Sequence, residues 1–134
     1  SADERDVIEH LHDYVPTGET VIVQPWTGSA VTYALTGYKV TAAHPLYTAT
    51  PDAREIYQHL NEAADNPAVC SAVQNSKAYY YLDFKGREIN EEIRGDHRSQ
   101  YPGLENLQQK GVAEPVYSKG EATLYRITAC GTPQ

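Results

Sequence analysis

Hydrophobic residues recur at helical spacing in the first fifteen positions of the chain. Val7, Ile8, Leu11 and Val15 fall on one face, and acidic side chains gather near the amino-terminal end of the segment, which predicts an amphipathic helix. Pro16 to Gly18 break this helix. The next segment, residues 20–24, is a short and continuous apolar run of the kind found in buried parallel strands.

A second helix and a second strand are predicted before residue 50. Apolar residues keep a helical stripe from Ala30 to Leu35, and Gly37 suits the left-handed position just past a helix end. A strand follows at residues 38–43. The thirteen or so residues between the two strands are about what a crossover between parallel strands needs.

Two proline-containing helix starts precede the strongest strand signal of the chain. Thr50-Pro51 opens a helix with a buried stripe that continues to Ala64, and Asn66-Pro67 opens a shorter one. Residues 78–84, Ala-Tyr-Tyr-Tyr-Leu-Asp-Phe, are then typical of a strand.

The rest of the chain is a polar segment followed by a hairpin. Residues 85–111 read as one long polar loop, which is either functional or mobile. Residues 115–118 and 122–129 flank a Lys119-Gly120 turn and alternate like the strands of a hairpin. We therefore predict a single α/β domain over residues 1–134, with three layers, a Rossmann-like and mostly parallel sheet, and a C-terminal antiparallel β-hairpin. If the first strand lies between the second and third, a crevice opens at their carboxyl ends.

Composition narrows the class of protein. The 134 residues carry 11 basic and 18 acidic side chains, a net charge of −7, which argues against nucleic acid as a partner. There are 11 Tyr against one Phe and one Trp, so much of the apolar area comes from rings whose hydroxyls need polar partners. We expect most of these rings in the core or at its rim with their hydroxyls directed outward, leaving Tyr47 and Tyr101 as ligand contacts. The chain has no Met, which indicates a piece excised from a longer protein.

Three loops meet at the predicted crevice and supply the candidate site residues. The expected ligand-binding residues are Gln24, Trp26, Thr27, Gly28, Ser29, His44 and Tyr47. Free N–H groups at a helix start favour an anion or a hydroxyl there, although Thr27 or Ser29 as a simple helix cap is the alternative. Trp26 is either a platform for a sugar ring or a packing residue.

Catalytic and metal chemistry have weaker signals. His44 and Asp83 would form an acid/base pair if their loops touch, against the alternative that each only shapes its own turn. No Ser lies in a nucleophile elbow, and neither the histidines nor the acidic residues have the spacing of a metal site. We therefore expect no metal and no cofactor. Cys70 and Cys130 are too far apart for a CxxC site, and they are two core thiols inside a cell or a disulfide outside the cytoplasm.

Several short motifs together resemble a known family. They occur in order from about Thr20 to Cys130, and they read Pro25-Trp26-Thr27-Gly28-Ser29-Ala30, Tyr33-Ala34-Leu35 with Gly37, Asn66-Pro67-Ala68-Val69-Cys70, Tyr81-Leu82-Asp83-Phe84, Tyr101-Pro102-Gly103-Leu104 and Leu124-Tyr125-Arg126-Ile127-Thr128-Ala129-Cys130. This set is similar to the C-terminal soluble domain of actinobacterial multi-pass membrane proteins of unknown function, which look like cell-envelope glycosyltransferases using lipid-linked sugars. His44-Pro45-Leu46-Tyr47 replaces a longer loop of that family.

The resemblance implies a compartment, a covalent link and a role. It implies a domain on the extracytoplasmic face of the membrane, with the transmembrane helices of its own parent chain as partners, and a Cys70–Cys130 disulfide. A non-catalytic module that binds a glycan or lipid-linked sugar is favoured by the missing nucleophile and metal motifs. The alternatives are an enzyme acting on envelope sugars through Asp83 and His44, and a structural cap on the transmembrane bundle.

Overall fold

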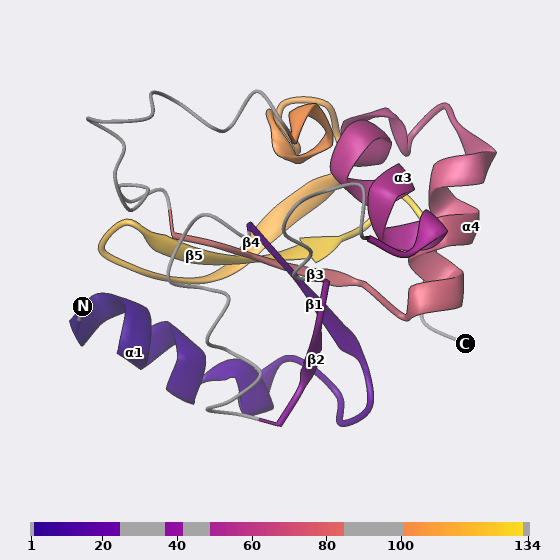
Figure 1. Cartoon of the computed structure of the whole chain (residues 1–134). Helices are drawn as coiled ribbons and strands as arrows, with labels where there is room; N and C mark the ends of the chain where they lie inside the picture. Colours follow the sequence, from indigo (N-terminus) through magenta and orange to yellow (C-terminus); the bar gives the residue numbers. More distant parts are fainter. Residues whose placement is uncertain (1, 25–36, 42–48, 85–100, 133–134) are drawn as a thin grey trace, which may run out of the picture.

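The computed structural model describes residues 2–24, 37–41, 49–84 and 101–132. Within them the strands form one five-stranded sheet in the order β2-β1-β3-β5-β4 (Figure 1). The strands are β1 (Thr20–Val23), β2 (Lys39–Val40), β3 (Tyr80–Asp83), β4 (Ala113–Lys119) and β5 (Ala122–Ile127). β1 pairs in parallel with β2 and β3, whereas β5 pairs antiparallel with β3 and β4. The predicted Rossmann-like α/β architecture with a C-terminal hairpin is confirmed, and β1 lies between β2 and β3 as the crevice requires.

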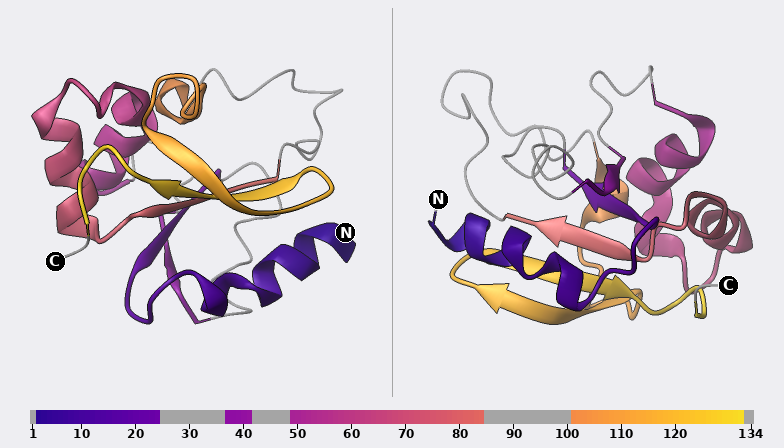
Figure 2. Two further views of the ribbon diagram at one scale, coloured as in Figure 1. Left: turned by 180° about the vertical axis from the view of Figure 1, so that it is seen from behind. Right: turned by 90° about the horizontal axis from the view of Figure 1, so that it is seen from below.

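Helices cover both faces of the sheet, so the domain has three layers (Figure 2). One face carries α1 (Ala2–Glu9) and η1 (Leu11–Asp13), and the other carries α3 (Pro51–His59), η4 (Leu60–Glu62), α4 (Pro67–Ser76) and η6 (Pro102–Leu104). The core accordingly consists of two clusters, one on each face. Val7, Ile8, Leu11 and Val15, the stripe predicted from the sequence, are all buried in the first.

The predicted helix starts have the capping geometry that their sequences indicate. The Thr50 side chain accepts a hydrogen bond from Ala53 N at 3.2 Å, and the Asn66 side chain accepts one from Ala68 N at 3.1 Å. A proline occupies the first turn of α3 and of α4, where its missing N–H has no partner to lose. α4 ends at Lys77, whose φ of 53° turns the chain into β3.

A tyrosine fastens α1 to the edge of the sheet. The Tyr117 hydroxyl on β4 donates a hydrogen bond to an Asp6 carboxylate oxygen at 2.5 Å, and the Tyr117 ring stacks on His10 with centroids 4.6 Å apart. This hydrogen bond to the Asp6 carboxylate stabilises the protonated hydroxyl and raises the pKa of Tyr117 to about 12. The hydrogen bond of His10 to the Asp6 carbonyl raises the pKa of His10.

The end of the predicted polar loop is part of the core. Tyr101, Leu104 and Leu107 are buried against the α3 and α4 side of the sheet. Gly103 lies so close to α3 that a Cβ atom there would be 2.5 Å from both His59 N and Ile56 O. Residues 85–100 of that loop and the helix expected from Ala30 to Leu35 lie outside the described residues.

Candidate functional site

The site is built at the carboxyl ends of β1 and β3. β2, the next strand along the chain after β1, lies on one side of β1, whereas β3 lies on its other side and is followed there by β5 and β4, so the strand order reverses between β1 and β3. A crevice at such a point is where ligands bind in open α/β sheets. Gln24 follows β1 directly, and Asp83 is the last residue of β3.

Two adjoining hollows lie at this edge, and together we call them the carboxyl-edge groove. We call the hollow beside Gln24 the inner hollow and the hollow beside Gln109 the outer hollow. The inner hollow has a volume of about 420 Å³, and the outer hollow has a volume of about 210 Å³. They share four lining residues, Tyr81, Asp83, Leu104 and Asn106. The inner hollow adds Gln24, Tyr101 and Glu105, and the outer hollow adds Leu107, Gln108, Gln109 and Tyr125.

One wall of the groove is the segment that follows η6. Asn106 has a φ of 58°, and its carbonyl accepts a hydrogen bond from Lys110 N at 3.0 Å, which closes a turn over residues 106–110. The Asn61 side chain of η4 donates to the carbonyl oxygens of Pro102 at 2.9 Å and Glu105 at 3.3 Å. The wall is thus tied to the helical layer by hydrogen bonds as well as by the buried Leu104 and Leu107.

The sheet side of the groove presents aromatic rings. Tyr81 on β3 and Tyr125 on β5 are directly opposite in the antiparallel register, and their rings stack with centroids 6.0 Å apart and an interplanar angle of 20°. Tyr101 packs behind the wall against Tyr57, with ring centroids 5.1 Å apart. The groove therefore combines two stacked rings with amide and carboxylate groups. The amides can donate hydrogen bonds to the hydroxyls of a ligand, and both the amides and the carboxylates can accept hydrogen bonds from them.

A tyrosine side chain bridges the carboxyl ends of β1 and β2. The Tyr57 hydroxyl lies 2.9 Å from Val23 O, 2.5 Å from Thr41 O and 2.9 Å from Thr41 Oγ1, and Thr41 Oγ1 also accepts from Val23 N. The expectation that helix tyrosines direct their hydroxyls outward is wrong for Tyr57. Its ring is fully buried, and its hydroxyl points inward because the strand ends there offer acceptors.

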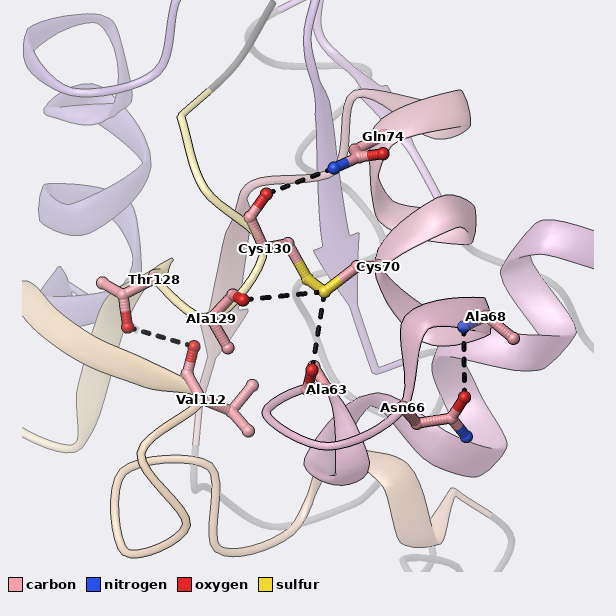
Figure 3. Close-up of a disulfide and its surroundings, with 9 residues drawn as sticks. All are labelled: Ala63, Asn66, Ala68, Cys70, Gln74, Val112, Thr128, Ala129 and Cys130. Atoms are coloured by element: carbon pink, nitrogen blue, oxygen red, sulfur yellow. Dashed lines mark hydrogen bonds between the residues drawn. A yellow bond between two sulfur atoms is a disulfide. The ribbon is translucent and has the colours of Figure 1, made fainter.

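A disulfide joins α4 to the segment after β5, at the end of the sheet opposite the carboxyl ends of β1 and β3 (Figure 3). Cys70 on α4 and Cys130 after β5 are joined, with Cα atoms 5.1 Å apart. Cys70 Sγ lies 3.5 Å from Ala63 O and 3.7 Å from Ala129 O, and Gln74 Nε2 donates to Cys130 O at 3.3 Å. The predicted pairing is confirmed.

The sequence from residue 1 to 129 matches the model of a family of unknown function, DUF6541. The chain belongs to DUF6541. Its fold is similar to that of the C-terminal globular domain of an oligosaccharyltransferase from Archaeoglobus fulgidus, with a TM-score of 0.55 and 9% sequence identity over 92% of this chain and 96% of that chain. This likeness shows the fold. The comparison with curated proteins found no match.

In this member of DUF6541, two of the sequence-predicted site residues line the groove. They are Gln24, which is 7% exposed, and Asp83. Trp26, Thr27, Gly28, Ser29, His44 and Tyr47 lie outside the described residues, so their roles and the pairing of His44 with Asp83 stay predictions. Tyr101 also lines the inner hollow, although its ring is buried.

Sequence reasoning missed the wall and the aromatic side of the groove in this DUF6541 chain. Asn106, Gln108 and Gln109 were assigned only to a polar loop, and Tyr125 only to the hairpin. The available signal was the run Asn106-Leu107-Gln108-Gln109, in which amide side chains surround one apolar anchor. Among the described residues, no group of three or more His, Cys, Asp or Glu side chains is placed to hold a metal ion. Across the same ranges, none of the helices has the length and apolar character needed to cross a membrane.

Proposed function

We propose that this chain is a soluble domain of a glycosylation-related membrane protein, and that it binds or positions a glycan in the carboxyl-edge groove. The observation that carries the proposal is the groove itself, which lies at the sheet edge where ligands of α/β domains bind. Its amides, carboxylates and tyrosine rings suit a ligand that offers hydroxyl groups and an apolar ring face.

Two further findings support this assignment. The fold is shared with a soluble domain of an oligosaccharyltransferase, a protein named for its action on sugars. The Cys70–Cys130 disulfide favours an oxidising compartment, because disulfides persist mainly outside the cytoplasm. We therefore place the domain on the extracytoplasmic face of a membrane, with the transmembrane helices of its own parent chain as partners and a lipid-linked sugar as a source of the glycan. In this proposal the parent protein acts in cell-envelope glycan assembly. Its actinobacterial origin stays a prediction.

The role is non-catalytic in this proposal, with an enzyme acting on envelope sugars as the alternative. The alternative draws support from Asp83, a carboxylate shared by both hollows. Asp83→Asn and His44→Ala in the intact membrane protein separate the two roles. Loss of turnover with retained glycan binding contradicts the non-catalytic role, and unchanged turnover contradicts the enzyme.

Binding is tested on the 134-residue chain by nuclear magnetic resonance. The backbone amides are titrated with maltotriose, mannotriose and chitotriose, each added separately. We expect at least one of these sugars to shift the amide signals of Asp83, Asn106 and Gln109, and Asn106→Ala to weaken its binding. Ser71→Ala, on the exposed side of α4, is the matched control and leaves binding unchanged.

The structural-cap alternative makes the opposite prediction. If the domain only holds the transmembrane bundle, none of the three sugars shifts the groove signals. Shifts confined to residues away from the groove likewise contradict the proposed site.

A further inference from the structure

We propose that the carboxyl-edge groove holds two consecutive sugar units, one in each hollow, so that its ligand is a glycan of at least two residues. This inference rests on the proposed glycan binding. It adds the minimum length of the ligand and assigns a different contact to each unit. The evidence is the division of the groove and the different chemistry of its two halves.

The two hollows are continuous through the residues that they share. Asp83 and Asn106 belong to both, so they stand at the junction, where two linked units would meet. Gln24 belongs only to the inner hollow and Gln109 only to the outer one. A ligand that contacts both of these residues must extend from the end of β1, past β3, to the wall segment beside β5.

The volumes of the two hollows limit how much of the ligand each hollow can hold. Small-molecule sites have volumes of roughly 300–1,000 Å³. The outer hollow, at about 210 Å³, falls below this range by itself, whereas the inner hollow, at about 420 Å³, lies near its lower end. The outer hollow has about half the volume of the inner one, so it takes the smaller share of the ligand. The groove as a whole suits a short glycan.

The halves differ in the contacts that they offer. The inner hollow is lined by Gln24 and Tyr101, which are both buried, and by the exposed Glu105. The outer hollow is lined by the half-buried Tyr125 and by Gln108 and Gln109, whose side chains are exposed. Tyr125 is braced by stacking on Tyr81, so its ring is held in place as a platform for the face of the second unit. The second unit therefore binds mainly by stacking and the first mainly by hydrogen bonds.

The test compares N-acetylglucosamine, chitobiose and chitotriose, together with glucose, maltose and maltotriose, by titration of the 134-residue chain. In the series that binds, we expect the disaccharide to bind at least about tenfold more tightly than the monosaccharide, and the trisaccharide to gain less than about threefold more. Tyr125→Val is expected to remove the gain of the second unit and to leave monosaccharide affinity unchanged. Tyr125→Phe keeps the ring and is the matched control, which retains the gain.

A second variant guards against a folding defect in the strand. Gln109→Ala lies on the exposed wall, and we expect it to reduce disaccharide affinity severalfold without changing that of the monosaccharide. Equal affinity for the monosaccharide and the disaccharide overturns the two-unit inference and leaves glycan binding intact. The inference is also overturned if the Tyr125→Val and Gln109→Ala variants weaken monosaccharide and disaccharide equally. Absence of binding by every sugar in both series contradicts the proposed function and, with it, this inference.

Discussion

The hydroxyl of Tyr57 on α3 lies 2.9 Å from the carbonyl oxygen of Val23, the last residue of β1. A tyrosine from the helical layer thus donates a hydrogen bond to a carbonyl oxygen at the end of a parallel strand. Because the same hydroxyl also contacts Thr41, it joins β1 to the segment after β2. Among the described residues, the hollows at the carboxyl edge lie on the β3 side of β1, whereas Tyr57 bridges the strand ends on the β2 side.

Removing this hydroxyl destabilises the domain. We expect Tyr57→Phe to lower the free energy of unfolding by about 1–3 kcal/mol, because buried strand-end carbonyls lose their partner while the ring still packs on Tyr101. Urea denaturation followed by circular dichroism measures the change. Tyr14→Phe, at a half-buried ring beside Tyr117, is the control and costs less than about 0.5 kcal/mol. Equal effects of the two variants contradict this account.

Gly103 is expected to tolerate no side chain. Gly103→Ala places a methyl group 2.5 Å from backbone atoms of Ile56 and His59, which cannot rotate away, so we expect a loss of about 3 kcal/mol in the free energy of unfolding. Gly131→Ala, at a φ of 78° with open space around it, is the control and costs about 1–2 kcal/mol from backbone strain alone. Thermal unfolding of the two variants measures both losses of stability. A Gly103→Ala protein that is as stable as the Gly131→Ala protein contradicts the close packing of η6 on α3.

The disulfide is expected to supply a large part of the stability. Cys70 and Cys130 close a loop with a sequence separation of 60, which corresponds to about 4 kcal/mol in the chain-entropy model. Reduction with dithiothreitol should lower the midpoint of urea unfolding of the wild-type chain. Without reductant, the Cys70→Ala, Cys130→Ala double variant should already unfold at about that lowered midpoint. The double variant is its own control, since the reductant should leave its midpoint unchanged. A midpoint insensitive to reduction in the wild-type chain contradicts the prediction.

Glu19 gives the stability a pH dependence. Glu19 is 7% exposed, and its Oε1 atom has no hydrogen-bond partner among the described residues. Burial raises the pKa of Glu19 above its usual value of 4.5, and Lys77 opposes this shift. Burial raises the pKa of Tyr38, Tyr79 and Tyr80, and the nearby Glu19 charge raises it in the same direction as the second cause.

The sign of the effect follows from proton linkage. Because the folded protein holds the Glu19 proton more tightly than the unfolded chain does, the stabilisation is fully present below pH 4.5 and is lost as the pH rises through the raised pKa. In urea titrations between pH 4 and pH 8, we expect Glu19→Gln to become more stable relative to wild type as the pH rises. Glu121→Gln, at the exposed hairpin turn, should run parallel to wild type. A Glu19→Gln curve that also runs parallel to wild type contradicts the prediction.

The strand order was predictable because its signals are local. The apolar run before Gln24, the prolines at positions 51 and 67, and the hairpin turn at Gly120 each fix one element through backbone chemistry. Once these elements are placed, short connections leave few topologies, and the crevice between β1 and β3 follows. This is why Gln24 and Asp83 could be placed at one edge in advance.

The wall of the groove was not predictable in the same way. Tyr101 and Leu107 are spaced in a polar segment with no helical or strand period, and their burial depends on contact with α3 and α4, which are distant in sequence. The inward direction of the Tyr57 hydroxyl likewise depends on Val23 and Thr41, 34 and 16 positions away. Long-range partners decide both features, and spacing along the chain does not encode them.

The two ends of the described chain lie toward opposite ends of the strands of the sheet. Asp3 lies against Gly120, at the hairpin tip beside the carboxyl end of β3, whereas Cys130 is bonded to α4 beyond the other end of that strand (Figure 1). A fluorophore or surface tether attached after residue 132 therefore sits beyond the strand ends farther from the groove, and one attached before residue 2 sits near the hairpin tip, on the face of the sheet opposite the groove wall. Immobilisation through the C-terminus is the geometry that leaves the carboxyl-edge groove facing solution.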